Sequence, residues 1–355
     1  MRGKVLRLKK LHYIDQLVGP TSLDIINALS NHAEVHLHTG GIIKTYAGLD
    51  SRVVTHQRAA YNKNTFSRRL FSWFAFYFTT VPSVIFRKKD VLFLVSNPPL
   101  NFLFGFAVAR MFKLKYHLLL WDIYPDIIVQ SKYVSANSTI VKIWSRLNRQ
   151  CLKSADSIFT ISENLAAEIR KYLPSGVDNI RIVPNWVNSD EIKPIPKDQN
   201  AFILRQNLQD KFIVMYSGNM GQTHDLETIV EAAKHLSQHT DIHFVLIGDG
   251  AKRAKLVKMV EDWKLQNIRI LPFQEPDMFK FSIASADVGF VTTTDGFETY
   301  SVPSKTYYLM AAGCIVVAIA NEKSELNNLI RQHEFGYRFD PGNAVALAAN
   351  VLKIY

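Results

Sequence analysis

Residues 286–320 read ADVGFVTTTDGFETYSVPSKTYYLMAAGCIVVAIA, and this stretch decides the fold. The apolar runs ADVGFVTTT and CIVVAIA have the length and the β-branched content of buried strands, and a helix is predicted between them from about Thr306 to the closing AAG. Buried strands joined by a helix are typical of a parallel sheet. The loop before the helix carries Glu298, Ser304 and Lys305, so an acid and a cation are expected near one helix start.

The same alternation runs through both halves of the chain. In the N-terminal half we expect strands at 4–14, 35–39, 91–97, 116–122 and 157–162, with helices at 22–32, 101–112, 139–155 and 163–173. In the C-terminal half we expect strands at 212–219, 243–250 and 268–273, and helices at 225–239, 251–265 and 345–355. The predicted class is α/β, with two doubly wound, Rossmann-like domains facing across a cleft. We expect an N-terminal domain over 1–184, a linker over 185–211 and a C-terminal domain over 212–355.

Charge is divided unevenly between the two halves. The net charge is +11, but residues 1–184 hold 25 Lys and Arg against 11 Asp and Glu, whereas residues 185–355 hold 17 against 20. A basic half attracts anionic lipid, phosphorylated substrates or nucleic acid. No zinc spacing, helix-turn-helix signal or RNA-binding motif accompanies it, so we expect no nucleic acid partner.

The uncharged stretch 70–86, LFSWFAFYFTTVPSVIF, lies between basic clusters. It is short for a transmembrane helix, and Thr79, Thr80 and Pro82 interrupt it. We interpret it as a core helix with partial contact to a membrane surface. Two distant cysteines and the absence of a signal-peptide pattern favour a cytoplasmic protein.

Three strand-to-helix turns of the C-terminal half carry groups suited to an anion. SGNMGQTHDL at 217–226 supplies two glycines, GDGAKR at 248–253 supplies Lys252 and Arg253, and the opening stretch supplies Ser304 and Lys305. Each turn alone is an ordinary one; together they indicate one anionic nucleotide ligand.

These turns resemble the donor domain of family-4 glycosyltransferases with the GT-B fold. The resemblance rests on GNMG at 218–221, GDGAKR at 248–253, ADVGFV at 286–291 and ETYSVPSKTYYLMAAG at 298–313. The N-terminal half adds VLFLVSNPPLNF at 91–102, LLLWDIYPDIIV at 118–129, TISENLAAEI at 160–169 and IVPNWVN at 182–188. The chain is most similar to the branch that builds O-antigen and capsular polysaccharide.

The resemblance implies a retaining, metal-independent hexosyl- or N-acetylhexosaminyl-transferase. Its donor would be a nucleotide-diphospho-sugar, a UDP-sugar in preference to a GDP-sugar, with no other cofactor. Its acceptor would be a saccharide linked to polyprenyl diphosphate, and the protein would be peripheral at the inner face of the cell membrane, held on anionic lipid by the N-terminal domain.

The resemblance also assigns residues. Glu298 would bind hydroxyls of the transferred sugar, and Asp122 would accept or orient the proton of the attacking hydroxyl. A helix N-cap role is the alternative for Asp122, and Asp126 is a second candidate. The implied donor contacts are Ser304, Lys305 and Arg253 at the diphosphate, Gly218, Asn219 and Gly221 as close backbone, Pro272 and Phe273 beside the base, and Gly19 closing from the first domain.

The sequence departs from the family pattern at three places. The family's two glutamates fall on Tyr300 and Tyr308, so the Tyr308 hydroxyl is expected to replace a carboxylate at the ribose. The arginine usual after the first glycine is Asn219, and His224 stands near the usual lysine; we interpret His224 as a surface or capping residue. The short C-terminus leaves no room for a final crossing helix.

Two other functions share this architecture. One is a nucleotide-sugar 2-epimerase, which would need further acids and a basic cluster in the cleft. The other is a non-catalytic module that binds a nucleotide sugar. His36 and His38 alternate on a predicted strand without an acidic partner, so no metal site is expected there.

Overall fold

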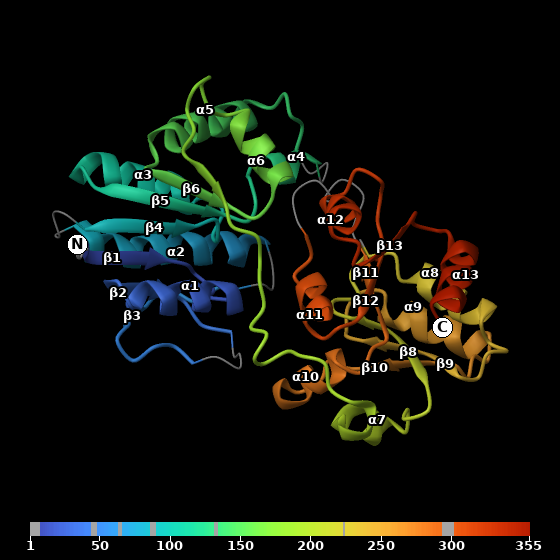
Figure 1. Cartoon of the computed structure of the whole chain (residues 1–355). Helices are drawn as coiled ribbons and strands as arrows, with labels where there is room; N and C mark the ends of the chain where they lie inside the picture. The colour runs from blue at the N-terminus through green and yellow to red at the C-terminus, as the bar shows by residue number, and fades with distance from the viewer. Residues whose placement is uncertain are drawn as a thin grey trace. The chain divides into compact units, whose positions relative to one another are not determined.

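The computed structural model describes residues 8–43, 48–62, 66–85, 90–130, 134–222, 224–292 and 302–355. The chain divides into two compact units, Met1–Pro184 and Asn185–Tyr355 (Figure 1). Each unit is a parallel sheet with helices on both faces, so the prediction of two doubly wound α/β domains is confirmed.

The first unit is built on a seven-stranded sheet in the order β3-β2-β1-β4-β5-β6-β7. Its elements in chain order are β1 (Leu8–Ile14), α1 (Pro20–Ser30), β2 (Ala33–Thr39), β3 (Val54–Gln57), α2 (Phe66–Ile85), β4 (Val91–Val95), α3 (Asn101–Phe112), β5 (Lys115–Leu120), α4 (Asp126–Gln130), α5 (Thr139–Ser154), β6 (Ser157–Thr160), α6 (Glu163–Arg170) and β7 (Ile180–Ile182).

Strand order decides which helices share a face of this sheet. Crossovers between parallel strands are right-handed, so connections that move in opposite directions place their helices on opposite faces. The step from β1 to β2 runs one way, and the steps from β3 through β4 and β5 to β6 run the other way. Helices α2, α3 and α5 therefore form one layer, and α3 packs against both of its neighbours.

The second unit has a six-stranded parallel sheet in the order β10-β9-β8-β11-β12-β13. Its elements are the 3-10 turn Lys197–Gln199, α7 (Ala201–Gln206), β8 (Phe212–Ser217), α8 (Glu227–His235), β9 (Ile242–Ile247), α9 (Arg253–Asp262), β10 (Ile268–Leu271), α10 (Pro276–Ile283), β11 (Val288–Thr292), α11 (Lys305–Ala311), β12 (Ile315–Ile319), α12 (Glu325–His333), β13 (Gly336–Phe339) and α13 (Ala344–Ile354). Helix α13 packs on α8, which returns the chain to the face that α8 and α9 cover.

The segment 185–211, predicted as a linker, packs inside the second unit. The Asn200 side-chain oxygen accepts hydrogen bonds from the backbone N–H groups of Phe202 and Ile203 at 3.0 and 3.2 Å, which caps α7. Both of these apolar side chains are fully buried in a cluster with strand residues. Their burial is worth roughly 1.5–3 kcal/mol each, and it ties the segment to the sheet.

Helix α2 contains the uncharged stretch that the sequence placed partly in the core. Phe76 and Tyr77 are buried, whereas Phe71 and Phe78 are exposed to solvent, so the helix has one packed face and one open face. Within the described ranges given above, none of the helices combines the length and the apolarity needed to cross a bilayer.

A chain of buried polar groups crosses the first unit beside β1 and β2. Arg58 Nη2 lies 3.3 Å from His38 Nδ1, His38 Nε2 lies 2.8 Å from His12 Nδ1, and His12 Nε2 lies 3.0 Å from Asp90 Oδ2. Arginine always donates, so one set of neutral tautomers satisfies all three contacts: each imidazole accepts at Nδ1 and donates from Nε2. Burial and the neighbouring positive groups lower the pKa of His38 to about 2.

The expectation that this strand's histidines lack acidic partners is wrong. His36 Nε2 lies 2.9 Å from Glu34 Oε1, and His38 reaches Asp90 through His12. Asp90 is distant along the chain, so the sequence could not reveal that partner. Glu34, two residues before His36 on the same face of the strand, could have been recognised.

The buried chain of hydrogen bonds through His38 and His12 predicts a loss of folding stability in mild acid. A histidine held neutral in the folded state and titrating near 6.5 when unfolded contributes stability that is present above pH 6.5 and falls as the pH drops below it. Between pH 7.5 and 5 the loss is about 2 kcal/mol for one such histidine. Calorimetric unfolding of His38→Gln, which keeps a donor and an acceptor, should show a smaller acid effect than wild type. The exposed-site control His32→Gln should follow wild type, and equal acid effects in all three proteins would contradict the prediction.

Candidate functional site

The strand order of the second unit reverses between β8 and β11, which lie side by side. Open α/β sheets bind ligands at such a switch point, outside the carboxyl ends of the strands. The turns that follow β8 and β9 emerge at this edge, and the start of α11 lies beside them, so the described parts of all three predicted anion-binding turns meet there.

The glycine turns after β8 and β9 touch each other through their backbones. Gly218 has φ +153° and Gly248 has φ +147°, a conformation that residues with a side chain rarely adopt. A Cβ atom built on Gly248 would lie 1.9 Å from the carbonyl oxygen of Gly218. Two glycines are therefore required for the two turns to come this close.

A cavity of about 310 Å³ opens at this edge. Six of the predicted site residues line it: Gly218, Asn219, Phe273, Ser304, Lys305 and Tyr308. Helix α10 and the end of β9 complete the wall, with Phe279 packed edge-on against the Tyr308 ring at 5.3 Å between centroids. The cavity is thus apolar on the side of Phe273 and polar around Lys305.

Lys305 brings a cation into the cavity. Its Nζ donates to the Tyr216 hydroxyl at 3.0 Å and lies 4.2 Å from the centre of the Tyr216 ring. Among the residues that the structure describes, no acid lies within ion-pair distance of it. Burial lowers the pKa of Lys305 to about 8, so the charge is costly until an anion approaches.

The glycine at 218 makes room for this ammonium group. A Cβ atom at that position would lie 2.8 Å from Lys305 Nζ. Tyr216 fixes the same region because its hydroxyl donates to the Asn219 carbonyl at 2.7 Å. Tyr216 was missed by the sequence analysis, since a tyrosine in a buried strand reads as a core residue.

His224 also belongs to this edge, so the interpretation as a surface or capping residue is wrong. Its Nδ1 lies 2.9 Å from the Thr292 hydroxyl at the end of β11, and its ring packs edge-on near Tyr216. Burial first, and then the positive charge of Lys305, lower its pKa, which keeps the ring neutral. Neutral imidazole beside the cavity is available to donate or accept one hydrogen bond.

Lys252 is held by partners within the protein. Its Nζ donates to the His224 carbonyl and to Glu227 Oε2, both at 2.7 Å. Although burial opposes it, the hydrogen bonds from Lys252 and Lys255 lower the pKa of Glu227 to about 2. Of the two cations in GDGAKR, Lys252 is therefore part of the scaffold.

The remaining predicted donor residues lie around the cavity or beyond the described ranges. Gly221 lies beside the side chains of Asn219 and His224, Arg253 is the first residue of α9, and Pro272 is exposed in the turn after β10. None of these three lines the cavity. Glu298 falls outside the residues that the structure describes.

The first unit places its two predicted site residues at the carboxyl edge of its own sheet. Gly19 is the N-cap of α1, and a Cβ atom there would meet nothing within 4 Å. Asp122 follows β5, and burial raises the pKa of its carboxyl group. It precedes α4 by four residues, so it is not the N-cap of that helix. Asp126, the second candidate, accepts a hydrogen bond from the Tyr172 hydroxyl at 2.5 Å.

Asp15, which directly follows β1 at the same edge, was not predicted as a site residue from the sequence. Its carboxylate accepts from the Ser22 hydroxyl at 2.6 Å and from the Leu17 backbone at 3.2 Å, and burial raises its pKa to about 7. These bonds shape the turn that carries Gly19. An acid directly after a buried strand is the signal that could have found it.

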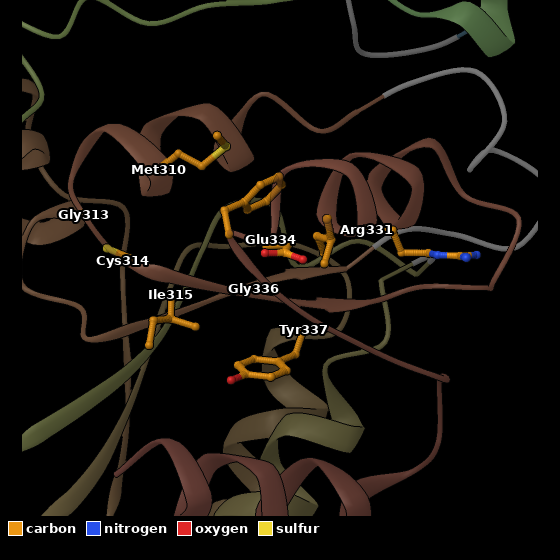
Figure 2. A pocket seen from close by; sticks show the side chains of 10 residues that line it. Met310, Gly313, Cys314, Ile315, Arg331, Glu334, Gly336 and Tyr337 are labelled. Atoms are coloured by element: carbon orange, nitrogen blue, oxygen red, sulfur yellow. The ribbon is translucent and has the colours of Figure 1, made fainter.

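A larger cavity of about 840 Å³ lies at the opposite edge of the second sheet, where β12 and β13 begin (Figure 2). Met310, Ile315 and Tyr337 form its apolar wall, and Arg331 and Glu334 stand at the end of α12. None of the predicted site residues lines it. The larger volume therefore does not mark the nucleotide site, because α/β sheets bind such ligands at their carboxyl ends.

The sequence is similar to known glycosyltransferases. Residues 211–355 match the family described as glycosyl transferases group 1. The chain is 28% identical over 299 residues to the probable glycosyltransferase WbjE of Pseudomonas aeruginosa, covering 82% of this chain and 73% of that protein. It is 29% identical over 195 residues to the putative colanic acid biosynthesis glycosyl transferase WcaI of Escherichia coli, covering 54% and 47%.

Solved structures share the fold. Anabaena Alr3699/HepE in complex with UDP and glucose superposes with a TM-score of 0.68 at 14% identity, covering 97% of this chain and 89% of that chain. WaaG, a glycosyltransferase involved in lipopolysaccharide biosynthesis, superposes with a TM-score of 0.68 at 12% identity, covering 97% and 90%. The two-unit α/β architecture of this chain is therefore that of the GT-B structures.

The close approach of the two glycine turns predicts the effect of one methyl group. Gly248→Ala should force the Gly218 turn away, because its Cβ would overlap the Gly218 carbonyl. We expect a loss of roughly 1–3 kcal/mol of stability, measured by denaturant unfolding, together with weaker ligand binding at the edge. Gly19→Ala, whose Cβ meets nothing within the chain, is the matched control and should unfold like wild type. Wild-type stability of Gly248→Ala would contradict the geometry.

Proposed function

We propose that this chain, a glycosyltransferase of group 1 with the GT-B fold, moves a sugar from a nucleotide-diphospho-sugar to a saccharide acceptor in cell-surface polysaccharide synthesis. The observation that carries the proposal is the ammonium group of Lys305, partly buried beside Gly218 with no carboxylate partner among the described residues. A diphosphate supplies the missing negative charge. The Anabaena neighbour solved with UDP and with UDP-glucose supports a UDP-sugar as the donor.

In this proposal the cavity of the second unit holds the nucleotide. Lys305 and Ser304 contact the diphosphate, and the backbone at Gly218 and Asn219 approaches it closely, with Arg253 and Gly221 at the outer side. The aromatic ring of Phe273 packs on the base beside Pro272. The Tyr308 side chain, which lines the same cavity, contacts the ribose in place of a carboxylate. Glu298 binds hydroxyls of the transferred sugar.

The chemistry follows from where negative charge develops. The bond between the anomeric carbon and the diphosphate oxygen breaks, and its electron pair passes to the diphosphate. The acceptor hydroxyl oxygen bonds to the anomeric carbon as its proton leaves. A fixed ammonium group and backbone donors stabilise the growing charge without reorganising, which is the largest contribution in many enzymes. We propose that the transfer retains the anomeric configuration and needs no metal.

The first unit supplies the acceptor side. Burial raises the pKa of Asp122, so its carboxylate is a better base than an exposed aspartate for the leaving proton, or orients the hydroxyl that carries it. Gly19, at the N-cap of α1, has open space around its backbone, which leaves room for a ligand. The acceptor is a saccharide on polyprenyl diphosphate, which places the enzyme at the inner face of the cell membrane, held there by the basic first unit.

Transfer from labelled nucleotide sugars tests this function directly. Purified protein incubated with a panel of UDP- and GDP-sugars and a membrane lipid extract should move label into the lipid fraction from a UDP-sugar, with EDTA present. Nuclear magnetic resonance of the product should give the same anomeric configuration as the donor. A changed sugar without acceptor indicates epimerisation, and protection against unfolding by UDP without turnover indicates a binding module. Either result overturns the proposal.

Replacing Lys305 separates its charge from its role in folding. Lys305→Met should weaken UDP binding about 10- to 100-fold, because it removes a charge-assisted hydrogen bond. The free variant should be at least as stable as wild type at pH 7, since an ammonium group that is buried without a carboxylate partner costs stability. In wild type, affinity should fall as the pH rises through about 8, where Lys305 loses its proton.

The matched control is Lys255→Met, in the same unit, whose Nζ is exposed and bonds Glu227 instead. Calorimetric titration with UDP should show wild-type affinity for this control and a flat profile near pH 8 for Lys305→Met. Wild-type affinity of Lys305→Met would remove Lys305 from the donor site.

A further inference from the structure

Helix α5 of the first unit has two apolar faces, and one of them is open to solvent. Val141, Cys151 and Leu152 form the buried face. Ile140, Ile143 and Leu147 recur at helical spacing and are 70%, 56% and 41% exposed. Isolated exposed apolar residues are ordinary, but a stripe along one helix is a contact surface.

Basic side chains lie along the same helix beside the stripe. Lys142, Arg146 and Arg149 line a groove of about 480 Å³, together with the Ser145 hydroxyl. None of these three cations forms an ion pair within the ranges that the structure describes. Positions 142, 146 and 149 project about a third of a turn from the apolar stripe, so both sets face outward together.

Helix α2, in the same layer, repeats the pattern with aromatic residues. Phe71, Phe74 and Phe78 follow the same spacing as the α5 stripe and are 74%, 47% and 77% exposed. Arg68 and Arg69 precede them in the first turn. Helix α3 packs between α2 and α5 and exposes Met111.

Helices α2, α3 and α5 carry charge of one sign, whereas α6, the next helix on this face, contains Glu163 and Glu168. The sequences of α2, α3 and α5 contain seven basic residues and no Asp or Glu: Arg68, Arg69, Arg110, Lys142, Arg146, Arg149 and Lys153. Exposed aromatic and aliphatic side chains bordered by cations alone are the signature of a helix that lies in the interface of an anionic bilayer. The stacked bases of a nucleic-acid duplex would leave the exposed phenylalanines and aliphatic side chains without partners, and a protein partner would have to supply a face that is both apolar and acidic.

We propose that the outer face of the α2–α3–α5 layer docks on anionic phospholipid, with lipid phosphates in the α5 groove and the α5 and α2 stripes inserted among the acyl chains. This inference rests on the proposed membrane location and adds the elements that make the contact. It goes beyond the uncharged stretch of α2, because α5 supplies the phosphate-binding groove.

The direction of the helices places the contact beside the acceptor side of the unit. Each helix of a right-handed crossover runs antiparallel to the strands, so its first turns lie at the carboxyl edge of the sheet. Phe71, Ile140 and Ile143 all fall in the first half of their helices. Asp122 lies at the same edge, after β5. A saccharide on a membrane lipid would therefore reach this edge from the docked face.

Flotation with vesicles tests the docking. Wild type should bind vesicles of phosphatidylcholine mixed with phosphatidylglycerol and should bind phosphatidylcholine alone far more weakly. The triple variant Lys142→Gln, Arg146→Gln, Arg149→Gln should lose on the order of 100-fold in partition, at about fivefold for each basic side chain near an anionic surface. Its charge-matched control in the second unit is Lys255→Gln, Lys258→Gln, Lys280→Gln, which should bind like wild type.

The apolar stripe has its own matched pair. Ile140→Ser with Ile143→Ser should lower partition, whereas Val345→Ser with Leu352→Ser, exposed on α13 of the second unit, should not. Since both native cysteines are buried, a fluorescent label on Ile143→Cys should shift to the blue on anionic vesicles, and a label on Val345→Cys should not. Unchanged thermal midpoints verify that these surface variants fold.

Failure of the docking and failure of the proposed function give different results. Transfer to a detergent-dispersed acceptor tests the chemistry without a bilayer, and the α5 variants should keep it. Wild-type protein that transfers sugar but floats equally with neutral and anionic vesicles, or with neither, overturns the docking alone. The same follows if the α5 variants and their controls float alike. Vesicle binding without any transfer supports the docking and overturns the proposed function.

Discussion

The site of the second unit depends on how closely two backbones approach. Gly248 lacks the atom that would meet the Gly218 carbonyl, and Gly218 lacks the atom that would meet the Lys305 ammonium group. Gly248, after β9, therefore makes room for the turn after β8, and Gly218 in that turn makes room for Lys305 at the start of α11. A larger residue at either glycine would move the cation and open the wall of the cavity. The polar wall of the cavity is thus assembled by packing, and the Lys305 ammonium group is held in it by its hydrogen bond to Tyr216.

Burial acts on the ionisable groups of both carboxyl edges, with opposite chemical results. In the second unit it lowers the pKa of Lys305 to about 8, which leaves a cation ready to gain from a diphosphate. In the first unit it raises the pKa of Asp15 to about 7 and raises that of Asp122. Removal from water disfavours the charged form in each case. One edge is therefore suited to an anionic leaving group and the other to a group that carries a proton.

Most of the strands and helices could be predicted from the sequence because their apolar residues form long runs or follow helical spacing. The central strands β8, β9, β11 and β12 are buried on both faces and read as continuous apolar runs. The edge strands β3 and β13 contain only exposed and half-buried residues, so they lack a long apolar run and were not predicted. Helices α10 and α12 were also not predicted, although Leu326, Leu329 and Ile330 of α12 follow helical spacing. At the site, the loop motifs located the cavity, but Tyr216 and His224 act through neighbours that only the folded chain brings together.

Helix α5 illustrates why sequence could place a helix and yet miss its open face. Apolar residues at helical spacing normally mark the side that packs on a sheet, and the run from Ile140 to Leu147 satisfies that pattern as well as the buried residues do. The packed side of this helix includes Asn148, whose amide donates to the Tyr124 carbonyl at 2.5 Å, so polarity alone does not reveal which side is buried. In the folded chain, the hydrogen bond of Asn148 within the unit keeps its side of the helix buried. The stripe that remains outside, bordered by cations without acids, is then the surface whose burial requires something other than this chain.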